Sequence, residues 1–432
     1  MDYNLPRLYK DYGEYSNYRN FPLDIDGLKP VERRVLLSTS KIARHKFVKS
    51  RQVDAYTIGH YHPHGECYGT IVQLVRQGFL IGQGNFGTNV GVEPVGPAAP
   101  RYTECKMNPK TLDLAFKYID HVPWIASELG DKEPTFLPIM YPACLLGSDY
   151  TQGIGFGFKT VIPCYDQRDL QQRLLWLLGI RKRKPTIAPK SNCNITAKPE
   201  KLELLLTTGK AKIAVEGIIL ENARTNTVIL KSWPPGKKFE SLLNKFSKEL
   251  GDGMIGFTDM SASETEIKFQ VLRERNRDKI YKEFVKKLKS VVVGVISFEI
   301  NLTDANQKVV VRSIDDMLLQ TYKMFSAMNK SMLDCEIMKL TELIEEYKIL
   351  DLIRKPLGDY ISKNNDIDFA LSEIEKLTGV SIEKTKILIN KYRIHKMFTL
   401  NTDTTEIDDK IKELTTNLKN IDKFVLEQYN DL

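Results

Sequence analysis

The segment GHYHPHGECYGT, residues 59–70, carries three of the chain's six histidines at every second position: His60, His62 and His64. Alternate residues of an extended strand share a face, so three imidazoles at this spacing could converge on a metal ion. Pro63 would interrupt a regular strand, however, and the neighbouring acids and cysteines are too few for a usual zinc set. His62 and His64 also offer donors to phosphate oxygens. Both interpretations are open on these residues alone.

A basic block lies immediately upstream of the histidines. Residues 29–51 contain eight Lys and Arg against Glu32 alone, whereas the last 33 residues contain four lysines against eight acids. Such a block suits a polyanion, most simply nucleic acid. The alternative is a solvated basic helix face.

Length and composition limit the class of protein. A chain of 432 residues with 42% hydrophobic and 27% charged residues predicts two to four globular domains. No apolar run approaches the roughly 18 residues of a membrane span, and the charged N-terminus does not resemble a secretory signal. The six cysteines are scattered without a C-x-x-C pair, which predicts reduced thiols and a cytoplasmic location.

The expected order of helices and strands along the chain predicts an α+β multidomain fold. Residues 28–80 read as short helices, with Pro30 suited to a first turn, and a Gly- and Pro-rich loop follows at 82–100. Strand-like runs alternate with amphipathic helices between about 150 and 330. From about 331 the chain is predicted to be helical.

Two apolar seams lie in this helical part. They have coiled-coil spacing and flank a small helical tip at about 366–400; their residues are Ile337, Leu340, Ile344 and Tyr347, then Ile407, Ile411, Leu414, Leu418, Ile421 and Val425. An antiparallel coiled coil with a globular tip is expected, and a helix pair packed on the main body is the alternative.

Two short motifs resemble binding sites, but the residues around them do not favour that interpretation. GQGNFG, residues 82–87, matches the dinucleotide pattern G-x-G-x-x-G, but no helix can follow it to hold a pyrophosphate. A glycine-rich loop that allows close approach to a partner backbone is the better interpretation. LDIDG, residues 23–27, contains two acids but reads as a turn. No Walker A motif is present.

PRYTE, residues 100–104, is the other chemical candidate. A tyrosine is a poor nucleophile unless a cation stabilises its phenolate, and Arg101 adjoins Tyr102. The same arginine could neutralise charge that develops on a pentavalent phosphate. An isolated Arg-Tyr pair is usually structural, so the wider pattern must decide.

Five motifs in one order supply that pattern: DGLKPVERR (26–34), KSRQVDAYTIGHYHPHGE (49–66), GQGNFG (82–87), RYTE (101–104) and GIGFGFKTVIP (153–163). Their order and spacing resemble the cleavage-reunion (A-type, ParC-like) subunit of type IIA DNA topoisomerases. The resemblance extends more weakly along the rest of the chain. The histidine segment is two residues shorter afterwards than in the bacterial family pattern. The compact length resembles the medium subunit of T-even phage topoisomerases.

The resemblance implies roles for individual residues. Tyr102 matches the nucleophile that becomes linked to a 5′ phosphate, and Arg101 and Arg19 match catalytic arginines. His62 and His64 would contact DNA near the scissile phosphate and bind no metal. Ile162 matches the residue that wedges between base pairs. The remaining DNA-contacting positions are Lys29, Arg33, Arg34 and Lys49.

The resemblance also implies an architecture. It predicts an N-terminal arm (1–27), a winged-helix DNA-gate domain (28–150), an α+β tower (151–330) and a coiled coil with a helical C-gate tip (331–432). The tip would supply a two-fold contact through its apolar surplus: Leu388, Ile389, Ile394, Met397, Phe398 and Leu400.

The implied assembly is a homodimer joined by two ATPase/TOPRIM subunits, which bind ATP and most of the Mg²⁺, in a bacterial or phage-infected cytoplasm. The implied activity is an isomerase that breaks, passes and rejoins duplex DNA. Because the sequence stops after the coil, relaxation or decatenation is expected rather than supercoiling. A non-catalytic DNA-binding scaffold of the same fold and a metal-dependent nuclease are the alternatives.

Overall fold

The computed structural model describes residues 4–148, 150–250, 254–272, 275–364 and 367–430, and the side chains of these except 246–250, 360–364, 394, 395 and 430. The chain forms two compact units, Met1–Phe325 and Ser326–Leu432. The four-part division expected from the sequence stays a prediction. Within the described ranges, no helix is both long and apolar enough to cross a membrane.

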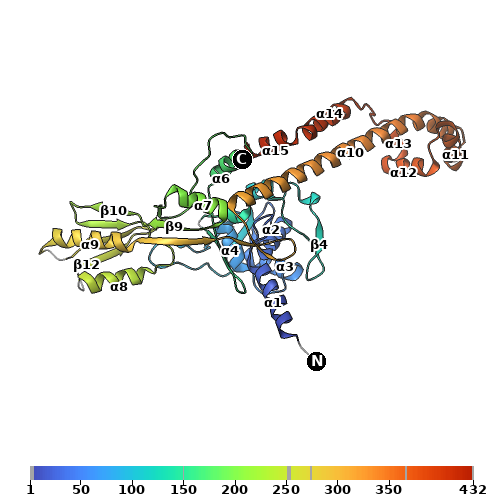
Figure 1. The fold of residues 1–432 in the computed structure, drawn as a ribbon. Helices are drawn as coiled ribbons and strands as arrows, with labels where there is room; N and C mark the ends of the chain where they lie inside the picture. The colour runs from blue at the N-terminus through green and yellow to red at the C-terminus, as the bar shows by residue number, and fades with distance from the viewer. Residues whose placement is uncertain (1–3, 149, 251–253, 273–274, 365–366, 431–432) are drawn as a thin grey trace. The chain divides into compact units, whose positions relative to one another are not determined.

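The first unit begins with the short helices α1 to α4 (Figure 1), and a small antiparallel sheet of order β1-β3-β2 packs with them. The short helices predicted for 28–80 are confirmed. Pro30 occupies the first turn of α2, where its missing N–H costs no hydrogen bond, and Glu32 accepts from the Lys29 N–H to cap the same end. The apolar core under them includes Val35, Val53 and Ile71, all fully buried. The elements are α1 (Leu5–Asn20), α2 (Pro30–Ile42), β1 (Val48–Lys49), α3 (Ser50–His60), α4 (Tyr68–Arg76), β2 (Leu80–Gln83) and β3 (Glu104–Met107).

A second group of elements contains an antiparallel sheet of order β6-β7-β14-β9-β8. The hairpin of β6 and β7 pairs Ile154 with Lys159 next to its turn. The elements are α5 (Pro109–Ala115), η1 (Ile119–His121), β4 (Trp124–Ala126), β5 (Lys132–Pro134), η2 (Ala143–Leu145), β6 (Tyr150–Ile154), β7 (Lys159–Pro163), α6 (Gln167–Leu177), β8 (Asn194–Ile195), α7 (Pro199–Thr208), β9 (Lys210–Glu216) and β14 (Val293–Glu299).

A third sheet, of order β10-β11-β13-β12, has its own core with α8 and α9. Val228, Phe269 and Phe284 are buried there. Strands and amphipathic helices therefore alternate as predicted, which confirms the mixed α+β class. The elements are β10 (Ile219–Asn222), β11 (Thr227–Leu230), α8 (Phe239–Leu250), β12 (Ile255–Asp259), β13 (Ile267–Val271), α9 (Arg277–Val291), and the small pair β15 (Asn301–Thr303) and β16 (Val309–Val311).

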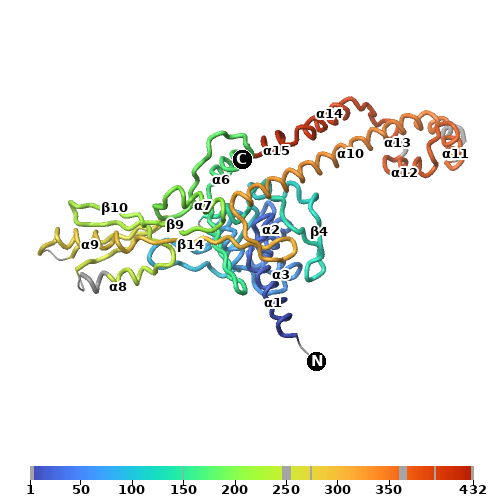
Figure 2. The backbone as a smooth tube through the Cα atoms, in the orientation of Figure 1, coloured from blue at the N-terminus to red at the C-terminus, as the bar shows by residue number. Residues whose placement is uncertain are grey.

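The second unit is helical. Its first helix, α10, begins at Ile314 within the first unit, earlier than the predicted 331. The chain runs out along α10 and returns along α14 and α15 (Figure 2). Arg354 donates to the Leu400 carbonyl at the far end, and Gln428 donates to Asn329 at the near end, so the antiparallel course is confirmed. The elements are α10 (Ile314–Asn364), α11 (Ile367–Thr378), α12 (Ile382–Tyr392), α13 (Ile394–Met397), α14 (Thr405–Lys419) and α15 (Ile421–Asn430).

The tip has a core of its own, so much of its apolar surplus is covered within the unit. Leu388 and Met397 are buried, and Ile389 and Leu400 pack against them. Phe398 keeps 44% of its surface exposed. The side chain of Ile394 lies outside the described residues.

Candidate active site

Tyr102 projects from a turn that is held firmly from behind. Its side chain is 64% exposed, whereas the next residue, Thr103, is fully buried and donates to Ser50 Oγ at 2.8 Å. The first amides of α3 bind the carbonyls of the same turn, Ser50 N–H to Thr103 O at 2.9 Å and Arg51 N–H to Pro100 O at 3.1 Å. The helix end thereby fixes the turn and leaves the phenol free to meet a ligand.

Arg101 lies beside the phenol as predicted. Its guanidinium carbon is 4.7 Å from the centroid of the Tyr102 ring, and the side chain of Arg101 is itself exposed. A cation at this distance can stabilise negative charge on the tyrosine oxygen or on a nearby phosphate. The pair can therefore serve nucleophilic chemistry on a phosphodiester.

The glycine-rich loop leads into this turn and does not cradle a nucleotide. No helix follows Gly87, and the chain instead reverses, with Thr88 and Val95 exchanging backbone hydrogen bonds. Gly87 has φ +74°, and an added Cβ would lie 2.4 Å from the Val95 carbonyl oxygen. Glycine is required there for the close approach of the two strands of the loop.

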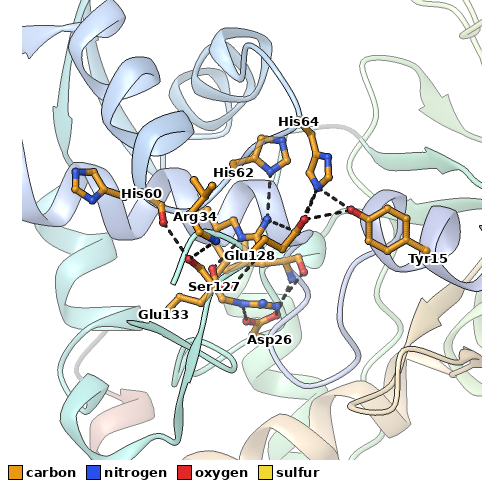
Figure 3. A network of polar contacts seen from close by, with 12 residues as sticks. Tyr15, Asp26, Arg34, His60, His62, His64, Ser127, Glu128 and Glu133 are labelled. Carbon is orange, nitrogen blue, oxygen red and sulfur yellow. Dashed lines mark hydrogen bonds and ion pairs between the residues drawn. The ribbon is translucent and has the colours of Figure 1, made fainter. Parts of the chain in front are cut away.

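The three histidines do not converge, because the segment is not a strand. His60 ends α3 and pairs with Asp131 at 3.0 Å, while His62 and His64 lie in the turns that follow. The rings of His62 and His64 are 5.1 Å apart, but their nitrogens have different partners (Figure 3).

His62 is nearly buried and is held by Arg34. The Arg34 guanidinium can only donate, so its 3.3 Å contact with Nδ1 makes that nitrogen the acceptor and places the ring proton on Nε2. Burial, followed by the charge of Arg34, lowers the pKa of His62 to about 4. At neutral pH the ring is therefore uncharged, and its Nε2–H can donate to a phosphate oxygen.

His64 belongs to a second arm of the same polar network. Its Nε2 lies 2.7 Å from the Tyr15 hydroxyl and 2.9 Å from a Glu128 carboxylate oxygen (Figure 3). Burial acts to raise the pKa of Glu128, but the hydrogen bond with His64 and the charge of Arg34 lower it overall. Glu128 thus remains ionised and joins His64 to Arg34, whose Nη1 is 3.3 Å away.

Nearly the whole chain matches a known protein family. Residues 19–430 match the family model for the A subunit of DNA gyrase/topoisomerase IV. The chain belongs to this family.

Among curated relatives, the DNA gyrase A subunit of Mycolicibacterium smegmatis is 28% identical over 61% of this chain and 34% of its own length. The DNA topoisomerase 4 A subunit of Escherichia coli (strain K12) is 34% identical over 39% of this chain and 24% of its own length. The chain thus matches about a third or less of the length of these two relatives.

Arg33 and Arg34 were predicted to contact DNA, but the structure shows both side chains buried and paired with acids. The Arg33 guanidinium pairs with Asp26 at 2.8 Å, and the two side chains are 8% and 0% exposed. Arg34 binds both oxygens of Glu133, at 2.8 and 2.9 Å. Each arginine already has a buried carboxylate partner, and a DNA phosphate that replaced this partner would leave a buried acid without its cation. They support the site from within.

The prediction that Ile162 is the wedge is wrong. It is fully buried in β7, whereas a residue that inserts between base pairs must be exposed. Ile154 of the same GIGFGFKTVIP motif is 81% exposed at the end of β6. Exposure therefore favours Ile154 for the wedge role, a candidate that the motif comparison missed.

The other predicted contacts lie within reach of solvent. Lys49 is exposed and pairs with Glu104 at 2.8 Å. Lys29 is partly buried and donates through Nζ to the Gln152 carbonyl at 2.8 Å. Arg19 lies in the last turn of α1, 5.7 Å from the ring centroid of Tyr15. Contact of these three with DNA stays a prediction.

The structure also shows what the two acids of LDIDG do. Asp24 pairs with Arg312 at 3.0 Å, and Asp26 accepts from the backbone of Leu28 and Leu137 as well as from Arg33. The predicted turn is confirmed. Across the ranges that the structure describes, no three His, Cys, Asp or Glu side chains are grouped to hold a metal ion.

Tyr15, Glu128 and Glu133 belong to the polar network around His64 and Arg34, and sequence reasoning missed all three. Glu128 meets its partners His64 and Arg34 across 64 and 94 residues of chain. No local spacing rule connects residues so far apart. The fold brings them together, and the β4–β5 connection that carries Glu128 is held at the end of α3 by the hydrogen bond from Ser127 to the His60 carbonyl.

Proposed function

We propose that this chain is the DNA cleavage-reunion subunit of an ATP-dependent type IIA topoisomerase. The observation that carries the proposal is the exposed Tyr102 phenol, fixed on a rigid turn with Arg101 over its ring. The phenol oxygen attacks a DNA phosphorus atom, the 3′ oxygen leaves with a proton, and a 5′-phosphotyrosine ester forms. Religation reverses these steps, and the ester retains the bond energy that resealing needs.

The surrounding groups are assigned by their charge and exposure. Arg101 stabilises the charge of the pentavalent phosphate, and Arg19 is proposed to assist. His62 donates through its neutral Nε2–H, while His64 is positioned by Tyr15 and Glu128. Lys29 and Lys49 neutralise neighbouring phosphates. Ile154 opens a base step and bends the duplex.

The complete enzyme requires components beyond this chain. Mg²⁺ prefers several carboxylate or water oxygens, and the acids of this site are already engaged by arginine and histidine, so they do not suit the ion. Mg²⁺ and ATP are therefore assigned to a TOPRIM/ATPase partner. Two copies of this chain, one tyrosine per strand, would join two partners in a cytoplasmic heterotetramer that relaxes or decatenates DNA.

The experiment is adduct formation by Tyr102→Phe with the partner, Mg²⁺ and a detergent trap. The variant should bind DNA as the wild type does and form no 5′-linked protein–DNA adduct. Tyr9→Phe is the matched control, because Tyr9 is 62% exposed on α1. Adduct in Tyr102→Phe would refute the nucleophile, and strand cleavage without any adduct would favour a nuclease.

A further inference from the structure

Four consecutive cations follow α6, away from the residues assigned to cleavage. The sequence GIRKRKP places them at Arg181, Lys182, Arg183 and Lys184. Three of the four are exposed, and Arg181 is half-buried. Like charges this close repel one another, so an arrangement that keeps them together suits an anionic ligand.

The connection that carries them follows α6 (Figure 2), and backbone hydrogen bonds hold it at both ends. Gly179 takes φ +74° after α6, and the N–H groups of Ile180 and Arg181 both bind the Leu175 carbonyl at 3.0 Å. Further along, Ile187 is buried, and the Lys190 N–H donates to the Cys164 carbonyl at 2.7 Å. The cations therefore sit on an anchored support rather than on a free tail.

Among the described residues, Lys184 is the one cation of the four that has an acidic partner. Lys184 pairs with Glu203 and lies 4.9 Å from the Trp176 ring, which Arg173 also covers at 4.5 Å. Arg181 donates its Nε–H to the Arg183 carbonyl at 3.0 Å. Within the part of the chain that the structure describes, no acid forms an ion pair with residues 181–183.

We propose that residues 181–183, the 181–183 cluster, bind the phosphate backbone of duplex DNA outside the cleavage site. A phosphodiester chain presents regularly spaced charges that three adjacent flexible cations can meet in any register, without base recognition. An acidic protein would need its carboxylates matched to the loop, and nothing in the loop other than charge offers such a match.

The loop that carries the cluster is anchored beside the same strand that forms the hairpin with Ile154. The loop is tied at Cys164, directly after β7, and the opposite end of β7 forms the hairpin with Ile154. The loop therefore belongs to the same compact unit as Tyr102 and the hairpin. That this unit holds duplex DNA rests on the proposed function.

The test is the salt dependence of DNA binding by the full chain carrying Arg181→Gln, Lys182→Gln and Arg183→Gln. Each lost phosphate contact reduces the slope of log K against log salt by about 0.9, so the triple variant should lose about 2 to 3. Adduct formation at saturating DNA should be unchanged, while the DNA concentration for half-saturation rises. The matched control is Lys279→Gln, Lys282→Gln and Lys286→Gln, which removes the same charge from exposed positions on α9.

The outcomes separate the possibilities. An unchanged slope overturns the inference, and so does an equal loss in both triple variants, because only net charge would then matter. Loss of binding to the ATPase partner with normal DNA binding would indicate an acidic protein ligand and would also overturn it. Failure of the wild type to form any adduct would refute the proposed function, but the slope comparison would still decide the role of the 181–183 cluster.

Discussion

Replacing Arg33 by Gln separates an internal ion pair from a DNA contact. The variant leaves Asp26, whose side chain is fully buried, without its cation. Removing one partner of a buried pair costs about 3–5 kcal/mol, because the remaining charge is uncompensated. Lys49→Gln is the matched comparison: its pair with Glu104 is 49% and 29% exposed, which makes it worth less than about 1 kcal/mol.

Two measurements on each variant give opposite patterns. The chain's three tryptophans, Trp124, Trp176 and Trp233, all lie in the first unit, so their fluorescence during urea unfolding reports the stability of that unit. Arg33→Gln should lose about 3–5 kcal/mol and keep the salt slope of DNA binding. Lys49→Gln should keep its stability and lose about 0.9 of that slope. A stable Arg33→Gln protein with a reduced slope would show that Arg33 contacts phosphate after all.

Two further predictions concern His62 and Ile154. The pKa of His62 is about 4 in the folded state, below the ordinary 6.5. Its contribution to the free energy of unfolding is therefore complete above pH 6.5 and is lost as the pH falls towards 4, because the unfolded chain then binds the proton first. Over this interval the wild type should lose up to about 3 kcal/mol more than His62→Gln in urea unfolding. The groups that set this pKa, Arg34, His64, Arg19 and Glu128, are the same in both proteins. Ile154→Ala should reduce DNA bending, measured by energy transfer between the duplex ends, without loss of stability. Ile162→Ala should instead lower the free energy of unfolding by about 2–5 kcal/mol. Normal bending by Ile154→Ala would show that another residue is the wedge.

The elements were predictable where a local pattern determined the structure. Pro30 indicated the start of α2, alternating apolar residues indicated the strands, and the 4-and-3 spacing of the second seam indicated the return helices. The same rule misplaced the start of α10 by 17 residues, since the seam begins only at Ile337 while the helix begins at Ile314. Apolar spacing marks where a helix packs along one face, not where it starts.

The site was predictable only in part, because charge in a sequence does not reveal its partner. The block from Lys29 to Arg51 contains eight basic residues and one acid, yet the fold brings Asp26 to Arg33 and Glu133 to Arg34. The sequence does not distinguish a buried arginine from an exposed one. The acid that neutralises a buried arginine can lie 99 residues away. Exposure therefore has to be known before a cation can be counted as a ligand for DNA.

The two isoleucines of GIGFGFKTVIP make the same argument for an apolar side chain. Both belong to one hairpin, and the chemistry of the residue type is identical. Ile162 pairs with Thr151 inside the sheet and is fully buried, whereas Ile154 stands beside the turn and is 81% exposed. A wedge must leave water for a base step, so the gain from burial exists only for the residue that is exposed beforehand. The residue type identifies both isoleucines as candidates. The free energy that each would gain by burial in DNA decides between them.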